Sequence, residues 1–116
     1  MLRDPRAFLW DVREAALAIQ SFTTGMDAAA YAANDMAQSA VERKFEIIGE
    51  ALNQLVKRDA SLGARIPNLP QIVAFRNQLI HGYATVNVGT VWNVMKTALP
   101  PLVGAVQTML DELGQP

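Results

Sequence analysis

The longest regular pattern in this sequence is a stripe of apolar residues between positions 35 and 58. Apolar side chains recur there every three or four residues, so they share one face of a helix. The stripe consists of Ala37, Val41, Phe45, Ile48, Leu52 and Leu55, and Ile47 and Ala51 widen it. No strand-like alternation of apolar and polar residues occurs elsewhere in the sequence, which predicts an all-α fold.

Residues that favour a helix start precede the other apolar segments. These residues are Asp4-Pro5, Asp27, Pro70 and Asn87. They predict a long helix ending near Thr24, a short helix over 28–33, a helix ending at Gly82 and a final helix. Prolines 100 and 101 predict a kink or a break in that final helix, and residues 59–70 have the composition of a loop. We therefore expect one domain over residues 1–116, an up-and-down helical bundle of four main helices plus a short one.

Composition restricts the function further. With a formal net charge of -1, the chain has no bulk attraction for polyanions, so nucleic-acid binding needs a local basic patch or assembly. The absence of cysteine excludes disulfides and Cys-ligated zinc, and the single histidine argues against a dedicated metal site. We therefore expect no metal and no cofactor. No segment reaches the roughly 18 apolar residues of a membrane span, so we expect a cytoplasmic protein without membrane contact.

The segment from Arg76 to Tyr83 concentrates polar side chains among apolar ones. It contains Arg76, Asn77, Tyr83 and the only histidine of the chain, His81. On a helix, Asn77 stacks under His81, whereas Arg76 lies about 140° around the axis from His81. One helix therefore cannot easily direct Arg76 and His81 at the same atom. A second copy, packed antiparallel across a two-fold axis, could bring four such groups into one cleft.

These residues can also have purely structural roles. A histidine near a helix end can cap carbonyl groups or interact with the helix dipole, and an arginine can belong to a surface ion pair. Along the 35–58 helix, Glu50 and Arg43 either belong to a solvated polar face or face the cleft and support the motif. Because polar groups are costly to bury unpaired, the clustering around His81 favours a cleft or a polar interface. We take Glu50 as a candidate supporting residue.

Arginine and histidine together suit cleavage of a phosphodiester bond without a metal. An imidazole can take a proton from a ribose 2′-hydroxyl or donate one to the leaving 5′-oxygen near neutral pH. The guanidinium of Arg76 can hold the phosphate and stabilise its growing charge, and Asn77 could orient the ring or the phosphate. RNA carries its own 2′-hydroxyl nucleophile and DNA does not, so the expected substrate is RNA.

The same residues resemble a known family. Arg76-Asn77, followed after the intervening positions by His81-Gly82-Tyr83, is similar to the R-x4-6-H signature of HEPN domains (higher eukaryote and prokaryote nucleotide-binding). The R-x4-H-x-Y form is that of HepT-like toxins. Further matches lie at 40–43, 46–51, 66–67, 91–92 and 99–100.

The resemblance implies a homodimer whose motif helices form a composite, metal-independent ribonuclease site that leaves a 2′,3′-cyclic phosphate. It also implies a partner, a minimal nucleotidyltransferase antitoxin that transfers AMP to the motif tyrosine. The resemblance further implies that Arg76 and His81 are catalytic, that Asn77 is the polar neighbour of the arginine, and that Tyr83 is the adenylylated position. An adenylyl group on Tyr83 would add bulk and negative charge at the cleft mouth and repel RNA.

Three functions remain open at this point. The leading hypothesis is a ribonuclease toxin whose substrate is an RNA such as tRNA or mRNA. The second is a non-catalytic binding subunit of a nucleotidyltransferase complex. The third is a structural helical dimer in which the polar cluster is only an interface network. The composition also favours a dimer. With 51% hydrophobic residues, so small a bundle exposes apolar surface that a second copy can cover.

Overall fold

The computed structural model describes residues 3–82 and 86–116, so Tyr83 lies outside the described residues. Within these ranges the secondary structure is entirely helical. The helices are α1 (Pro5–Phe22), α2 (Ala28–Ala32), α3 (Asp35–Arg58), α4 (Ala60–Gly63), α5 (Leu69–His81) and α6 (Val88–Leu113). The predicted all-α fold is confirmed, and no helix in the described ranges is both long and apolar enough to span a bilayer.

Short polar side chains cap most of the helices where the sequence predicts a start. Asp4 accepts a hydrogen bond from the backbone N–H of Arg6 at 2.9 Å and begins α1. Asp27 caps α2 in the same way, and Asn87 caps α6 by accepting from the N–H of Gly89 at 2.7 Å. Each cap satisfies an amide that has no partner inside the helix, which fixes where the helix begins.

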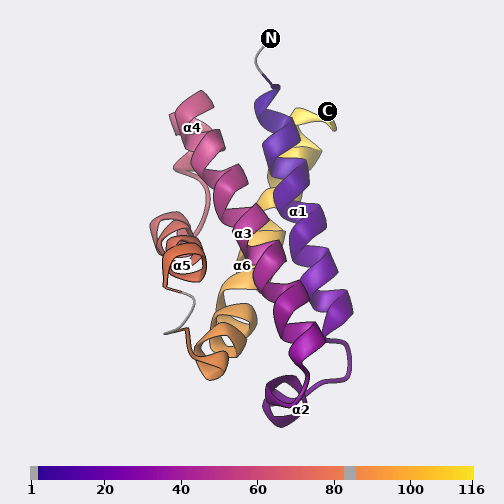
Figure 1. Ribbon diagram of the computed structural model, residues 1–116. Coiled ribbons are helices and arrows are strands. Elements are labelled where there is room, and N and C mark those ends of the chain that lie inside the picture. Colours follow the sequence, from indigo (N-terminus) through magenta and orange to yellow (C-terminus); the bar gives the residue numbers. More distant parts are fainter. Residues whose placement is uncertain (1–2, 83–85) are drawn as a thin grey trace.

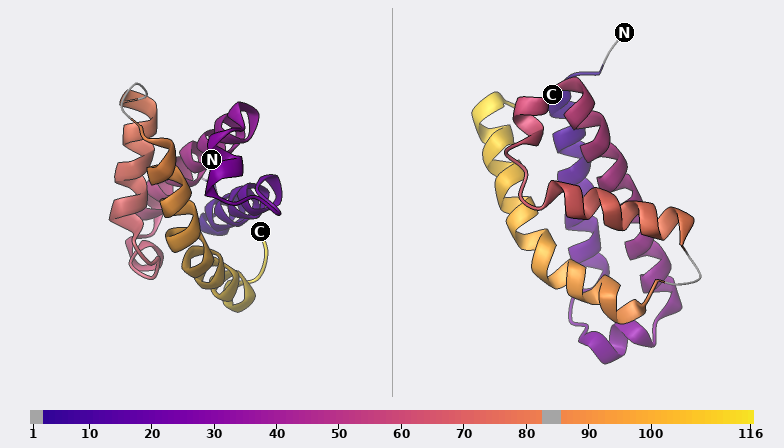
Figure 2. Two further views of the ribbon diagram at one scale, coloured as in Figure 1. Left: turned by 90° about the horizontal axis from the view of Figure 1, so that it is seen from below. Right: turned by 90° about the vertical axis from the view of Figure 1, so that its left-hand side faces the viewer.

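The four long helices are arranged around the predicted stripe on α3. Figure 1 shows α1 and α3 running side by side, with α6 behind them and both chain ends at the same end of the molecule. The side view in Figure 2 shows α5 crossing this group steeply. The four main helices of the prediction are thus present. However, α5 crosses the other three and does not run antiparallel to its neighbours, as an up-and-down bundle requires.

The core confirms the apolar stripe, because its six residues are buried, as is Ala51, while Ile47 is partly buried. The aromatic ring of Phe45 on α3 meets that of Phe75 on α5 edge to face, with ring centroids 5.2 Å apart. Such a pair adds about 0.5–1.5 kcal/mol beyond the area that it buries. This contact fixes the crossing helix α5 against the middle of α3.

The structure tests two local predictions. The segment 59–70, predicted as a loop, contains the short helix α4, because the Asp59 side chain accepts a hydrogen bond from the N–H of Leu62 at 3.1 Å. Helix α6 continues through Pro100 and Pro101, so the predicted break is absent. Figure 2 shows α6 changing direction along its length, which agrees with the alternative of a kink. Both prolines are exposed, so water can reach the carbonyl groups that they leave unpaired.

Candidate active site

Helix α5 approaches α3 closely at Gly49. A Cβ atom added at Gly49 would come within 2.5 Å of Cγ of Arg76 and closer still to its Cβ. These atoms belong to the stem of Arg76, close to the α5 backbone, and cannot swing away as a side-chain tip could. The missing side chain at Gly49 therefore lets the stem of Arg76 lie across α3.

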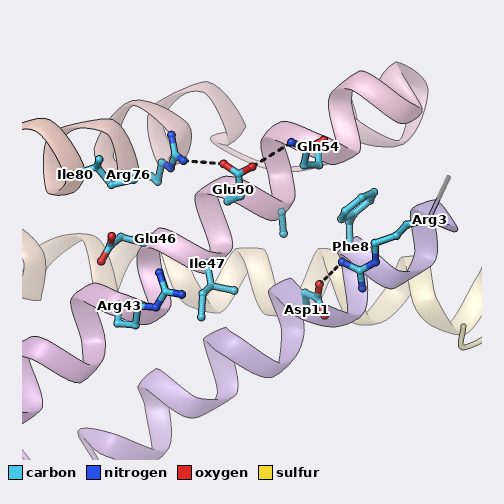
Figure 3. Close-up of a pocket in the computed structure, with 11 residues that line it drawn as sticks. Arg3, Phe8, Asp11, Arg43, Glu46, Ile47, Glu50, Gln54, Arg76 and Ile80 are labelled. Atoms are coloured by element: carbon cyan, nitrogen blue, oxygen red, sulfur yellow. Dashed lines mark hydrogen bonds and ion pairs between the residues drawn. The ribbon is translucent and has the colours of Figure 1, made fainter. Parts of the chain in front are cut away.

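The guanidinium of Arg76 is held by two neighbours. Its Nη2 forms an ion pair with Oε2 of Glu50 at 2.7 Å, and its Nη1 donates to Oδ1 of Asn77 at 2.9 Å. Glu50 in turn accepts a hydrogen bond from Nε2 of Gln54 at 3.1 Å (Figure 3). The Nε atom of Arg76 is buried and has no hydrogen-bond partner among the described residues. This network orients Arg76 and leaves part of its donor capacity unused.

Arg76 lines an open pocket of about 330 Å³ between α1, α3 and α5. Apolar side chains form one part of its wall, among them Phe8, Ile47 and Ile80. Charged and polar side chains line the rest, and Figure 3 shows them on neighbouring helices, with Asp11 on α1, Glu50 on α3 and Arg76 on α5. An apolar wall beside convergent polar groups is the usual composition of a ligand site.

The charges around this pocket are balanced. It is lined by three arginines and three carboxylates, namely Arg3, Arg43, Arg76, Asp11, Glu46 and Glu50. Two of the arginines are already paired, since Arg3 meets Asp11 at 2.8 Å just as Arg76 meets Glu50. The pocket therefore lacks a strong overall positive potential. An anion would have to bind through the directed hydrogen bonds of individual arginines.

His81 lies apart from this pocket. It is the last residue of α5, its side chain is exposed, and it does not line the pocket that Arg76 lines. Five positions along a helix correspond to a rise of about 7.5 Å and a rotation of about 140°. One copy of the chain thus brings Arg76, Asn77 and Glu50 together and leaves His81 outside the group.

Sequence reasoning did not identify Gly49 and Gln54 as parts of this site. Gly49 offered a usable indication, because a glycine inside a helix costs about 1 kcal/mol relative to alanine and usually has a packing reason. Gln54 offered none, since a glutamine one turn from a glutamate is common on solvated helix faces.

An arginine held beside a pocket and a histidine on the same helix are side chains that phosphodiester cleavage can use. Comparison with known proteins points to the same class. Residues 12–109 match the family described as Ribonuclease HepT-like. The chain therefore belongs to the HepT-like ribonuclease family of HEPN proteins, as the motif had indicated.

Individual relatives resemble the chain over nearly its whole length. Putative RNase MJ1380 of Methanocaldococcus jannaschii is 35% identical over 107 residues, which cover 90% of this chain and 95% of the relative. Probable ribonuclease HepT of Thermococcus cleftensis is 31% identical over 109 residues, which cover 94% of this chain and 98% of the relative. No solved structure gives a significant match.

Proposed function

We propose that this protein is a metal-independent endoribonuclease and the toxin of a toxin–antitoxin pair. The observation that carries the proposal is the held guanidinium of Arg76, which lies in a pocket and belongs to a motif shared with a ribonuclease family. The names of the relatives agree with RNA as the substrate. A basic patch is not needed if individual arginines hold the phosphates.

The active unit is a homodimer in which two α5 helices pack antiparallel across a two-fold axis. One chain separates Arg76 from His81, and a second copy can bring its own His81 to the Arg76 of the first. The cleft would then contain two arginines and two histidines. This arrangement explains why a motif with both groups on one helix can still act on one phosphate.

In this cleft the imidazole of one His81 takes the proton from a ribose 2′-hydroxyl. The freed oxygen attacks the adjacent phosphorus, and the bond to the 5′-oxygen breaks. The second imidazole donates the proton that the leaving 5′-oxygen needs. Arg76 stabilises the negative charge that grows on the phosphate oxygens. The products are a 2′,3′-cyclic phosphate and a 5′-hydroxyl end.

A nucleotidyltransferase antitoxin would silence this site by transferring AMP to Tyr83. Tyr83 follows His81 by two positions and is outside the described residues, so the basis here is the R-x4-H-x-Y pattern alone. The added phosphate carries a negative charge, which opposes the binding of RNA next to His81. Mass spectrometry after co-expression with such a transferase should detect an adenylyl group on Tyr83.

The decisive experiment compares RNA cleavage by the wild type with Arg76→Ala and His81→Ala. We expect wild-type cleavage that persists in a chelator and leaves cyclic phosphate ends. Loss of general acid–base catalysis should slow His81→Ala by about 10²–10⁴-fold. Circular dichroism and light scattering should show both variants folded and in the wild-type oligomeric state. Cleavage by His81→Ala at the wild-type rate would contradict the proposal.

One observation favours a second function, a non-catalytic binding subunit of a nucleotidyltransferase complex. In the single chain both terminal nitrogens of Arg76 already bond to Glu50 and Asn77, and His81 does not line the pocket. On this alternative the purified protein cleaves no RNA. Arg76→Ala would then weaken binding to the transferase partner.

A further inference from the structure

The pocket beside Arg76 contains an arginine that no described residue engages. The other arginines of the chain each form an ion pair or a side-chain hydrogen bond: Arg3, Arg6, Arg13, Arg58, Arg65 and Arg76. Arg43 forms neither with any residue in 3–82 or 86–116, and it is exposed. Its full set of N–H donors is therefore available to a ligand.

Arg43 and Arg76 line the same pocket from different helices. Arg43 lies on α3 seven positions before Glu50, which places it two turns away on the same helix face, at a distance of about 10 Å along the axis. Glu50 holds Arg76 at the other end of this stretch. Figure 3 shows the Arg43 side chain at the pocket beside Ile47. A strand of RNA that follows the pocket wall would meet both guanidinium groups.

A carboxylate that could have neutralised Arg43 does not do so. Glu46 lies three positions later on α3, at a spacing where arginine and glutamate commonly pair on a helix. No N–O contact within 4.0 Å joins the two side chains. Arg43 thus differs from Arg76 and Arg3, whose carboxylates already hold them in place.

We propose that Arg43 binds the phosphate of an RNA nucleotide that neighbours the scissile one. This inference rests on the proposed ribonuclease function, in which Arg76 holds the scissile phosphate. The nucleoside between the two phosphates lies in the pocket, against the apolar side chains of Phe8 and Ile47. Arg43 suits this role because its planar guanidinium can form paired hydrogen bonds with phosphate oxygens.

The test measures binding of an RNA that cannot be cleaved. The probe is a fluorescently labelled RNA that the wild type cleaves, synthesised with 2′-O-methyl riboses so that it lacks the nucleophile. Anisotropy titrations at several potassium chloride concentrations give the affinity and its salt dependence. The variants are Arg43→Gln, which removes the charge, and Arg43→Lys, which keeps it. The matched control is Lys57→Gln, which removes a charge from an exposed position on α3 outside the pocket.

We expect Arg43→Gln to bind the probe about ten-fold more weakly, because one charge-assisted phosphate contact is lost. The slope of log affinity against log salt should fall by about 0.7, the value for one phosphate contact on a single strand. Arg43→Lys should keep the wild-type slope and lose part of the affinity. Lys57→Gln should match the wild type in both quantities.

Two results would overturn the role of Arg43 while leaving the ribonuclease proposal intact. One is wild-type affinity and slope for Arg43→Gln in a preparation whose wild type cleaves RNA. The other is an equal loss in Lys57→Gln, which would mean that any positive charge on α3 contributes equally. If the wild type neither binds nor cleaves RNA, the ribonuclease proposal itself fails, and the role of Arg43 fails with it.

Discussion

Replacing Gly49 by alanine should disturb the position of Arg76 more than it disturbs the fold. Carbon atoms in contact lie about 3.5–4.0 Å apart, whereas a Cβ at Gly49 would lie 2.5 Å from Cγ of Arg76. Helix α5 must therefore move away from α3 by about 1 Å to accept the methyl group. If Arg76 holds the scissile phosphate as proposed, a displacement of this size should slow RNA cleavage by about 100-fold.

The expected change in stability combines two opposing terms. Alanine in a helix interior gains about 1 kcal/mol over glycine, and the overpacked contact costs about 1–3 kcal/mol. Gly104→Ala is the matched control, because a Cβ added at Gly104 in α6 meets nothing within 4 Å. Urea unfolding should show Gly49→Ala to be about 1–3 kcal/mol less stable than Gly104→Ala.

RNA cleavage by the two alanine variants completes this test. Gly104→Ala should retain the wild-type rate, since it lies on an exposed part of α6. If Gly49→Ala is as stable as Gly104→Ala and cleaves RNA at the wild-type rate, then α5 does not depend on the close approach at Gly49.

Substitutions at three further positions test other parts of the structure. Glu50→Ala should slow RNA cleavage more than Glu50→Gln, whose amide oxygen can still accept from Arg76, and both should change stability by less than about 1 kcal/mol because the pair is partly exposed. Tyr31→Phe should raise the free energy of unfolding by about 1–3 kcal/mol, because the buried hydroxyl has no partner among the described residues. Burial and the charge of Glu42 raise the pKa of Tyr31 from 10.0 to about 12, so the wild type but not Tyr31→Phe should lose stability from this group as the pH rises across that interval. Asn87→Ala should lower stability by about 1 kcal/mol in urea unfolding, and no loss would mean that the cap is dispensable.

The helices themselves were predictable because their local determinants are strong. The apolar stripe on α3 and the caps at Asp4, Asp27 and Asn87 need no tertiary information, since each follows from periodicity or from one side chain and a nearby amide. The crossing direction of α5 was not predictable in this way. It depends on how Phe75 meets Phe45 across two helices that are far apart in sequence.

The site was predictable only in part for a related reason. Helix geometry alone indicates that Arg76 and His81 face different directions, and the structure places them accordingly. The pairing of Arg76 with Glu50 joins residues 26 positions apart, and sequence left open whether Glu50 faced solvent or the cleft. Packing at Gly49 decides that question, because it brings α5 onto the Glu50 side of α3.

The proposed dimeric site is tested most directly by mixing two inactive variants. Arg76→Ala and His81→Ala are unfolded and refolded together so that subunits exchange, and native mass spectrometry confirms the mixed dimer. In that dimer, the shared cleft contains one arginine, Arg76 of the His81→Ala chain, and one histidine, His81 of the Arg76→Ala chain. If the two groups act across the two-fold axis, the mixed dimer should cleave RNA faster than either parent. It should stay slower than the wild type, because only one of the two imidazoles is present. A mixed dimer as inactive as its parents would contradict a site built from two copies.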